Sequence, residues 1–319
     1  MALGPGGEFD LIRRFLAEEG ALPGGVRVGP GDDAAVLDGG MVISTDLSVE
    51  DVHFRRSWIT DEEIGFRAAV AALSDLAAMA ADPVGVLVSM AAPRGGAVDL
   101  EAVQRGVREA ATGAGACVLG GDLSRSPGPL IVDVTVLGCT DWPVLRTGAR
   151  PGDELWVTGT LGGAAAAVQA WEAGEAPAGK LRDRFARPTP RIAEARRLAE
   201  REIPHALIDI SDGLAGDVGH LSAASGVRMV LEAALIPVCD AVPGGSEQAL
   251  ALALHGGEDY ELCFAASPDG LDAADFEALL GVRATRVGRV EEGTGVWIEG
   301  EGGIESLERG GYDHLEVTS

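Results

Sequence analysis

Lysine and aromatic side chains are scarce in this 319-residue chain. Its single lysine is Lys180, and Phe, Trp and Tyr together make up 4% of the residues. A phosphate-binding loop of the G-x-x-x-x-G-K-[ST] type needs a lysine that the sequence does not place there. Lys180 lies in a loop-like Gly- and Pro-containing stretch, so Schiff-base chemistry in a desolvated pocket is not expected either. Any bound phosphate must therefore be neutralised by metal ions, arginine or backbone N–H groups.

Positive charge is also in short supply. Lysine and arginine number 25 against 50 aspartate and glutamate residues, which gives a net charge of −25. Such a chain repels nucleic acids and anionic membrane surfaces, so we expect neither as a partner. No apolar run is long enough to span a bilayer, and the N-terminal residues lack the basic and apolar segments of a signal peptide. We therefore expect a cytoplasmic protein.

The chain has few cysteines and no C-x-x-C spacing. The four are far apart and flanked by apolar residues: Cys117, Cys139, Cys239 and Cys263. This pattern predicts buried free thiols in a reducing compartment rather than a zinc site or a disulfide framework.

The hydrophobic pattern predicts two successive α/β domains, residues 1–145 and 146–319, joined by the R-T-G-A-R-P-G-D stretch at 146–153. Thr60 and Glu63 form a capping-box pattern, and Thr189 and Pro190 are expected to begin a later helix. In the first domain we expect helices at 8–19, 60–81 and 99–112, and strands at 41–47 (buried), 84–91, 116–119 and 130–139. In the second we expect strands at 154–158, 206–210, 227–231, 260–265, 285–290 and 296–299, with helices at 162–173, 188–201, after 213 to about 224, 246–254 and 273–280.

Aspartate recurs in six short segments, each beside glycine or inside an apolar run. They are Gly31-Asp32-Asp33, Thr45-Asp46 with the acidic stretch to His53, Ser74-Asp75, Gly121-Asp122, Asp209-Ile210-Ser211-Asp212, and Gly257-Glu258-Asp259. A carboxylate removed from water becomes neutral, pairs with a cation or binds a metal. Because cationic side chains are few, Mg²⁺ is the natural partner, and Mg²⁺ held by scattered carboxylates suggests phosphate chemistry.

Taken singly, several of these residues have simpler interpretations. Asp75 is the only charge in the apolar stretch 68–81, which favours a ligand role over an exposed position. Asp32 and Asp33 could form an acidic turn, Gly121-Asp122 a tight turn, and Asp212 a helix N-cap. A lone histidine such as His53 is more often packed, and Arg146 could be a surface charge. The joint occurrence of the segments favours one shared site.

In order and spacing, the acidic segments resemble the motif series of the thiamine-monophosphate kinase family. The match extends over nearly the whole chain, from Gly7-Glu8-Phe9 through Ser44-Thr45-Asp46, His53-Phe54, Leu73-Ser74-Asp75-Leu76, Gly120-Gly121-Asp122, Asp209-Ile210-Ser211-Asp212-Gly213 and Gly256-Gly257-Glu258-Asp259-Tyr260 to Gly311-Tyr312-Asp313. The resemblance implies a mixed α/β fold of two α/β domains with ATP and Mg²⁺ in the cleft between them. It also implies a homodimer in which the N-terminal sheets pair.

The resemblance further implies transfer of the ATP γ-phosphoryl group to thiamine monophosphate, giving thiamine diphosphate and ADP. It assigns several Mg²⁺ ions to Asp33, Ser44, Thr45, Asp46, Asp75, Asp122, Asp209 and Asp212. It assigns ATP contacts to Gly121, Asp122, Arg146 and Ser211, and contacts with the thiamine substrate to His53, Glu258 and Tyr312. The roles of Asp32, Asp51 and Asp217 stay open.

No catalytic general base or covalent nucleophile is expected. The acceptor is itself a phosphate, whose second pKa near ~6 leaves a nucleophilic oxygen at neutral pH. We therefore expect direct in-line transfer. The alternatives are another ATP-dependent member of the superfamily, such as aminoimidazole ribonucleotide synthetase, or a non-catalytic divalent-cation-binding protein. Continuous EF-hand spacing, which the latter would favour, is absent from the sequence.

Overall fold

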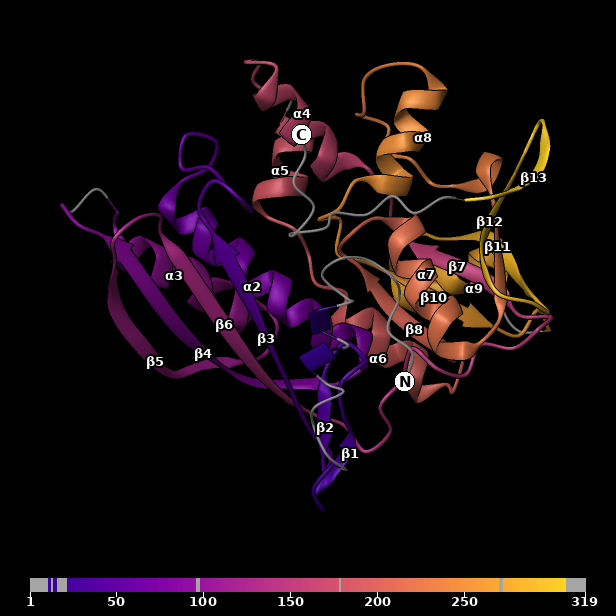
Figure 1. Cartoon of the computed structure of the whole chain (residues 1–319), viewed down its shortest axis with the longest axis horizontal. Helices are drawn as coiled ribbons and strands as arrows, with labels where there is room; N and C mark the ends of the chain where they lie inside the picture. Colours follow the sequence, from indigo (N-terminus) through magenta and orange to yellow (C-terminus); the bar gives the residue numbers. More distant parts are fainter. Residues whose placement is uncertain are drawn as a thin grey trace.

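The fold contains two β-sheets with helices packed against them, as seen in a computed structural model (Figure 1). The structure describes residues 11–307, apart from 13, 16–21, 96–97, 178 and 270–271. Within that part, the N-terminal sheet has strand order β1-β2-β3-β6-β4-β5, and the C-terminal sheet has order β13-β12-β9-β11-β7-β10-β8. The mixed α/β class expected from the sequence is confirmed. The expected helix at 8–19 lies mostly outside the described residues.

The N-terminal sheet is mainly antiparallel, with one parallel pair, β4 and β5, at its edge. Two helices, α2 (Asp61–Ala78) and α3 (Leu100–Gly113), cover one of its faces (Figure 1). The strands are β1 (Val26–Val28), β2 (Ala35–Leu37), β3 (Met41–Val49), β4 (Asp82–Pro93), β5 (Cys117–Ser126) and β6 (Ile131–Cys139).

The other face of this sheet, called here the outer face, is exposed. Along β3, Val42 and Ser48 are buried toward the helices, whereas Leu47, on the opposite side, is 50% exposed. Leu87 and Met41 are exposed on the same outer face. The sequence prediction of a buried strand at 41–47 is therefore wrong, because burial alternates with the period of two that a half-covered strand has.

The C-terminal sheet is antiparallel except for the parallel pair β9 and β12. Its strands are β7 (Glu154–Thr158), β8 (Pro204–Ile210), β9 (Arg228–Glu232), β10 (Glu261–Ala266), β11 (Ala284–Glu291), β12 (Gly295–Gly300) and β13 (Gly303–Ser306). The helices of this half are α4 (Gly163–Glu172), α5 (Gly179–Ala186), α6 (Ile192–Glu200), α7 (Leu214–Ser225), α8 (Ser246–His255) and α9 (Ala273–Leu280), with a 3₁₀ turn at Ala233–Leu235.

Helix α2 lies between the two halves of the molecule. It packs against β3, β4 and β6 on one side and against α5, α6 and β8 on the other. The expected capping box begins the helix: Glu63 N donates to Thr60 Oγ1 at 3.2 Å, and Thr60 N donates to Glu63 Oε2 at 2.9 Å. Short alanine side chains let neighbours approach from both sides. As a result, one hydrophobic cluster includes Leu76 of α2, Val134 of β6 and Phe264 of β10.

Most predicted elements are present, but four details differ. Helix α2 ends at Ala78 rather than near 81, and β5 continues to Ser126 rather than ending at 119. Lys180 lies in α5 instead of a loop, and α6 begins at Ile192, two residues after the proline expected to start it. No helix of the described chain combines the length and apolar character needed to cross a membrane.

The longer β5 and the exposure of two cysteines each have a clear physical cause. Gly121 pairs with Val88 in the parallel β4–β5 ladder, so it continues the strand rather than making the tight turn that Gly121-Asp122 suggested. A Cβ on Gly121 would lie 1.7 Å from the Val88 carbonyl oxygen, which explains why glycine is needed there. Cys117 and Cys139 are exposed because they lie at strand ends of the half-covered sheet, which corrects the prediction of four buried thiols; Cys239 and Cys263 are buried.

Candidate active site

A cleft of about 870 Å³ lies between the two halves of the chain. One wall comes from β3, α2 and the 51–58 loop, and the other from α4, α8, the end of β8 and the 256–260 loop. One end is lined by carboxylates and the other by apolar and aromatic side chains. Seven of the expected site residues line it: Asp46, His53, Asp75, Asp209, Ser211, Asp212 and Glu258.

Three carboxylates meet at the acidic end. Asp75 comes from α2, Asp209 from the end of β8, and Asp33 from the loop before β2, and each offers an oxygen within 4.8 Å of the others. The Ser44 hydroxyl donates to Asp75 Oδ2 at 2.5 Å, and the Ser74 hydroxyl donates to Asp209 Oδ2 at 2.6 Å. Burial and the neighbouring carboxylates raise the pKa of Asp75 well above its ordinary value and that of Asp209 to about 7. The cluster thus has an excess of negative charge that a bound cation would neutralise.

Arg146 supplies part of that positive charge. Its Nε and Nη2 donate to the two oxygens of Asp33, at 3.1 and 2.6 Å, in a bidentate pair. The Arg146 backbone N–H donates to both carboxylate oxygens of Asp32, at 3.2 and 3.3 Å. Burial and the charge of Asp33 raise the pKa of Asp32 to about 6. One guanidinium therefore faces several acids, and the remaining donor set, carboxylate and hydroxyl oxygen, is the kind that Mg²⁺ prefers.

Asp46 extends the acidic end along β3. Its side chain is on the helix-covered face, as that of Ser44 is. Burial, and then the charge of Glu258, raise the pKa of Asp46 to about 6.

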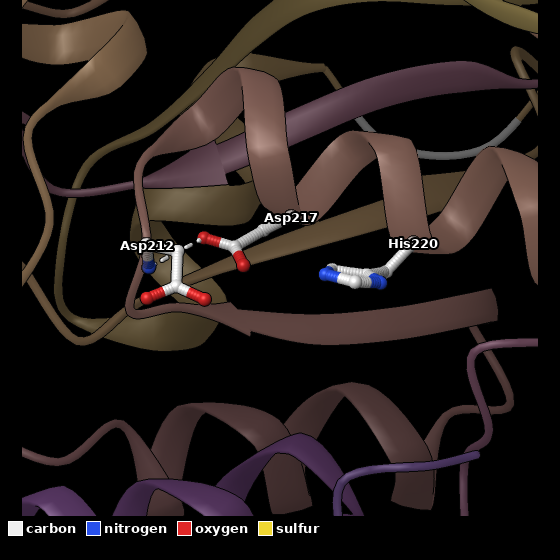
Figure 2. A group of neighbouring side chains, drawn as sticks. All are labelled: Asp212, Asp217 and His220. Atoms are coloured by element: carbon white, nitrogen blue, oxygen red, sulfur yellow. Dashed lines mark hydrogen bonds between the residues drawn. The ribbon is translucent and has the colours of Figure 1, made fainter. Parts of the chain in front are cut away.

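The turn between β8 and α7 carries Ser211 and Asp212 into the cleft. Gly213, with φ of 102°, is the N-cap of α7, so Asp212 is not the helix cap that the sequence allowed. The Ser211 and Asp212 N–H groups both donate to Asp217 Oδ2, each at 3.1 Å. Figure 2 shows the Asp217 carboxylate between the Asp212 backbone and the imidazole of His220, which is on the same side of α7. Burial and the charges of Asp212 and Asp209 raise the pKa of Asp217 well above its ordinary value.

Arg67 joins the two walls of the cleft. It is 4% exposed and forms an ion pair with Glu258 across the cleft. Its Nη1 donates to the Phe185 carbonyl oxygen at 2.8 Å, and the guanidinium lies 3.8 Å from the centroid of the Phe185 ring. The Tyr260 hydroxyl donates to Glu258 Oε2 at 2.5 Å. The sequence prediction did not include Arg67; the available signal was a cation just before the apolar part of α2.

Aromatic rings line the other end of the cleft. Trp58 stacks on Trp171, with centroids 5.1 Å apart and planes 6° apart, and Phe185 meets both rings edge-on. His53 lies nearby, and its Nδ1 accepts a hydrogen bond from the Val49 N–H at 3.1 Å. The sequence had not singled out Trp58 or Phe185, since their relation depends on packing between the two halves.

The structure does not bring all expected residues to the cleft. The Thr45 side chain is on the outer face, where its hydroxyl donates to Asp133 Oδ1 at 3.0 Å. Asp122 pairs in register with Ser89, which pairs with Asp133, so Asp122 shares that face. Gly121, its neighbour, lies on edge strand β5 and does not line the cleft. Tyr312 lies outside the described residues.

Known protein families and curated relatives match this chain over most of its length. Residues 31–140 match the family AIR synthase related protein, N-terminal domain, and residues 150–299 match AIR synthase related protein, C-terminal domain. The chain is 39% identical over 289 residues to the thiamine-monophosphate kinase of Rhodopirellula baltica, covering 85% of this chain and 86% of the relative. It is 35% identical over 324 residues to the enzyme of that name from Escherichia coli strain K12, with coverage of 97% and 98%.

Solved structures agree with the sequence relatives. AaThiL complexed with AMPPCP and TMP is 30% identical, with a TM-score of 0.81 and coverage of 99% of both chains. Thiamine-monophosphate kinase from Stenotrophomonas maltophilia is 35% identical, with a TM-score of 0.76 and coverage of 94% of this chain and 98% of that one.

Proposed function

Because the chain belongs to the thiamine-monophosphate kinase family, we propose that it transfers the γ-phosphoryl group of ATP to thiamine monophosphate, giving thiamine diphosphate and ADP. The observation that carries the proposal is the two-ended cleft. Its acidic end suits metal-bound phosphates, and its aromatic end suits the rings of thiamine. A related protein of this fold binds an ATP analogue together with TMP.

We propose that Mg²⁺ is held by Asp33, Ser44, Asp46, Asp75, Asp209 and Asp212, with Thr45 and Asp122 as further ligands. The cluster around Asp75 fits such an ion, since its donors are oxygens and its raised pKa values reflect burial together with the charge of neighbouring carboxylates. When bound, Mg²⁺ supplies the charge neutralisation that lets two phosphates approach each other. Arg146, Ser211, Gly121 and Asp122 are proposed to contact ATP.

At the other end of the cleft, His53 and Glu258, with Tyr312, are proposed to contact the thiamine substrate. Glu258 is held by Arg67 and by the Tyr260 hydroxyl, so its carboxylate has a fixed position at the cleft wall. The positively charged thiazolium ring of thiamine would be favoured beside that carboxylate and the aromatic side chains. The acceptor phosphate, largely deprotonated at pH 7, would attack directly, so no side chain needs to remove a proton.

The outer face of the N-terminal sheet suggests how Thr45 and Asp122 could take part. We propose that a second copy of the chain covers this face, as the sequence resemblance implied, burying Met41, Leu47 and Leu87. Thr45 and Asp122 would then lie at the interface. The domain division at 145/146 falls between the two sheets and is likewise proposed; the cytoplasmic location stays a prediction.

The function is tested by measuring ADP formation with ATP and Mg²⁺, with and without thiamine monophosphate. We expect turnover only when that acceptor is present, thiamine diphosphate as product, and no phosphate label retained on the chain after denaturation at neutral pH, which preserves a phosphohistidine that acid would hydrolyse. Turnover with formylglycinamidine ribonucleotide instead would identify the aminoimidazole ribonucleotide synthetase reaction. Cation binding without any turnover would leave a non-catalytic protein, and label on an aspartate or histidine would overturn direct transfer.

Ser44 and Thr45 form a matched pair of neighbouring hydroxyls on opposite faces of β3. Ser44→Ala removes the bond to Asp75 and is expected to lower kcat/KM about 10- to 100-fold, the usual cost of losing support for a metal ligand. Thr45→Val keeps the main-chain carbonyl oxygen, the only Thr45 ligand atom that can face the cleft of its own subunit, and changes only the side chain on the outer face, so we expect less than about a threefold effect. Steady-state kinetics at varied Mg²⁺ check both. Equal losses in the two variants, with the oligomeric state unchanged, would contradict this assignment.

A further inference from the structure

Asp217 is a buried acid that neither lines the cleft nor belongs to the expected ligand set. It is 2% exposed and lies in the first turn of α7, behind the turn that carries Ser211 and Asp212. Figure 2 shows one of its carboxylate oxygens hydrogen-bonded to the Asp212 backbone; an oxygen of each of the two carboxylates and a ring nitrogen of His220 also lie within 4.8 Å of one another. Asp217 is therefore a buried acid that lies behind the residues lining the cleft.

Asp217 contacts the backbone of the turn that precedes α7. A single oxygen, Oδ2, accepts both the Ser211 and the Asp212 N–H groups at 3.1 Å. These two groups precede the helix, so no carbonyl within α7 can accept their hydrogen bonds. Asp217 therefore acts as the acidic residue of a capping box does, reaching back from the first turn of the helix to backbone N–H groups that precede it; Gly213, the N-cap, has no side chain of its own to offer.

The 256–260 loop contacts the same turn from its other side. The Glu258 N–H donates to the Ser211 carbonyl oxygen at 2.8 Å. A Cβ on Gly257 would lie 2.3 Å from that oxygen, so the two backbones are in close contact. Ser211 and Asp212 are thus fixed between Asp217 behind them and the Glu258 loop in front. Loss of the rear contact would leave two part-buried donors unsatisfied and free the turn to move.

We infer that Asp217 is a positioning residue that acts as a hydrogen-bond acceptor, not as a metal ligand, and that it sets the place of the Ser211 hydroxyl and the Asp212 carboxylate in the cleft. The inference rests on the proposed function insofar as those two groups contact ATP and Mg²⁺. An acceptor role needs one oxygen and no charge. An asparagine amide oxygen can accept the same two bonds, whereas a carboxylate that binds Mg²⁺ would lose its negative charge, and with it much of its affinity for the ion, on the same substitution.

The test compares Asp217→Asn with Asp217→Leu, using hydrogen exchange of the peptide covering 209–214 in the absence of ATP. We expect wild-type-like exchange in the asparagine variant and about tenfold faster exchange in the leucine variant, the effect of losing one such hydrogen bond. In kinetics, we expect kcat/KM for ATP to stay within about threefold for asparagine and to fall about 10- to 100-fold for leucine, with a higher Mg²⁺ requirement. If leucine prevents folding, Asp217→Ala takes its place.

Asp153 provides the matched structural control. It is also buried and also accepts a backbone N–H, that of Arg150 at 2.8 Å, but it lies outside the cleft lining. Asp153→Leu is expected to lower thermal stability without changing exchange at 209–214 or the Mg²⁺ requirement. A folded Asp217→Asn variant that loses activity as leucine does would overturn the acceptor role. Faster exchange without any kinetic change in the leucine variant would overturn the positioning role. Because exchange needs no substrate, unchanged exchange in the leucine variant would overturn the acceptor role whether or not the chain is a kinase.

Discussion

Asp75→Asn is expected to lower phosphoryl transfer by more than about 100-fold while the protein remains folded. Changing a partner of a metal ligand commonly costs 10- to 100-fold, so replacing a central ligand should cost more. Asp75 is at the middle of the Asp33–Asp209 cluster and accepts the Ser44 hydroxyl, so asparagine preserves its shape but removes its charge. Initial rates at increasing Mg²⁺ measure the effect.

The same substitution is expected to raise the thermal stability of the metal-free protein. The pKa of Asp209 is about 7 in the folded protein, above its ordinary value of 3.8, because of burial and neighbouring carboxylates. The folded chain therefore holds protons that the unfolded chain releases, and the free energy of unfolding falls as pH rises from about 4 through 7. The stabilisation by Asp75→Asn should accordingly be larger at pH 8 than at pH 5, and Mg²⁺ should raise the melting temperature of the variant less than that of the wild type.

Glu62→Gln is the control on the same helix, since Glu62 is 43% exposed and pairs only at the surface with Arg105. It is expected to change neither turnover nor the response to Mg²⁺. Near-normal turnover by Asp75→Asn at saturating Mg²⁺ would show that Asp75 is not a ligand.

Arg67→Met is expected to weaken both stability and binding of the thiamine substrate. Removing one partner of a buried ion pair costs about 3 to 5 kcal/mol; because Glu258 is 27% exposed, we expect the lower end, about 3 kcal/mol. The Phe185 carbonyl oxygen also loses its donor. Since Glu258 would no longer be fixed at the cleft wall, KM for thiamine monophosphate should rise at least about tenfold, with a smaller change in KM for ATP. Chemical unfolding and steady-state kinetics measure the two effects.

Arg182→Met is the matched control for Arg67→Met. Arg182 also joins α5 to α2, through a bidentate pair with Glu63, but it lies away from the cleft. Its side chain is 33% exposed, so we expect a loss of about 1 kcal/mol or less and unchanged KM values. Similar kinetic changes in the two variants would mean that Arg67 acts only through packing of the two halves.

Local sequence signals predicted much of this molecule. The capping box at Thr60 and Glu63 correctly placed the start of α2, and the isolated charge of Asp75 in an apolar helix pointed to the cleft that the structure shows. Asp209 and Ser211 were also found at a strand end, where sites commonly gather. For these residues, the amino acids next to them in the sequence were sufficient to single them out.

The features that sequence reasoning did not capture depend on partners distant in the chain. Thr45 and Asp46 are adjacent, yet strand alternation sends their side chains to opposite faces, and only the pairing of β3 with β6 shows which face is covered. Gly121 looks like a turn until the parallel ladder with β4 is known. Arg67 gains its role from Glu258 and Phe185, more than a hundred residues away. Such relations arise only when segments far apart in the chain pack together.

Helix α2 is buried almost throughout, with one side in the N-terminal sheet and the other against the C-terminal half. The two sheets therefore share one hydrophobic cluster, to which Leu76, Val134 and Phe264 belong, while the C-terminal sheet also has a second cluster of its own that includes Leu155 and Ile208. Two architectural units thus make a single cooperative unit of folding, because a chain lacking either half would leave one side of α2 facing water. The geometry of the cleft depends on the same packing, because the helix that contacts both of its walls also carries Asp75 and Arg67 into it.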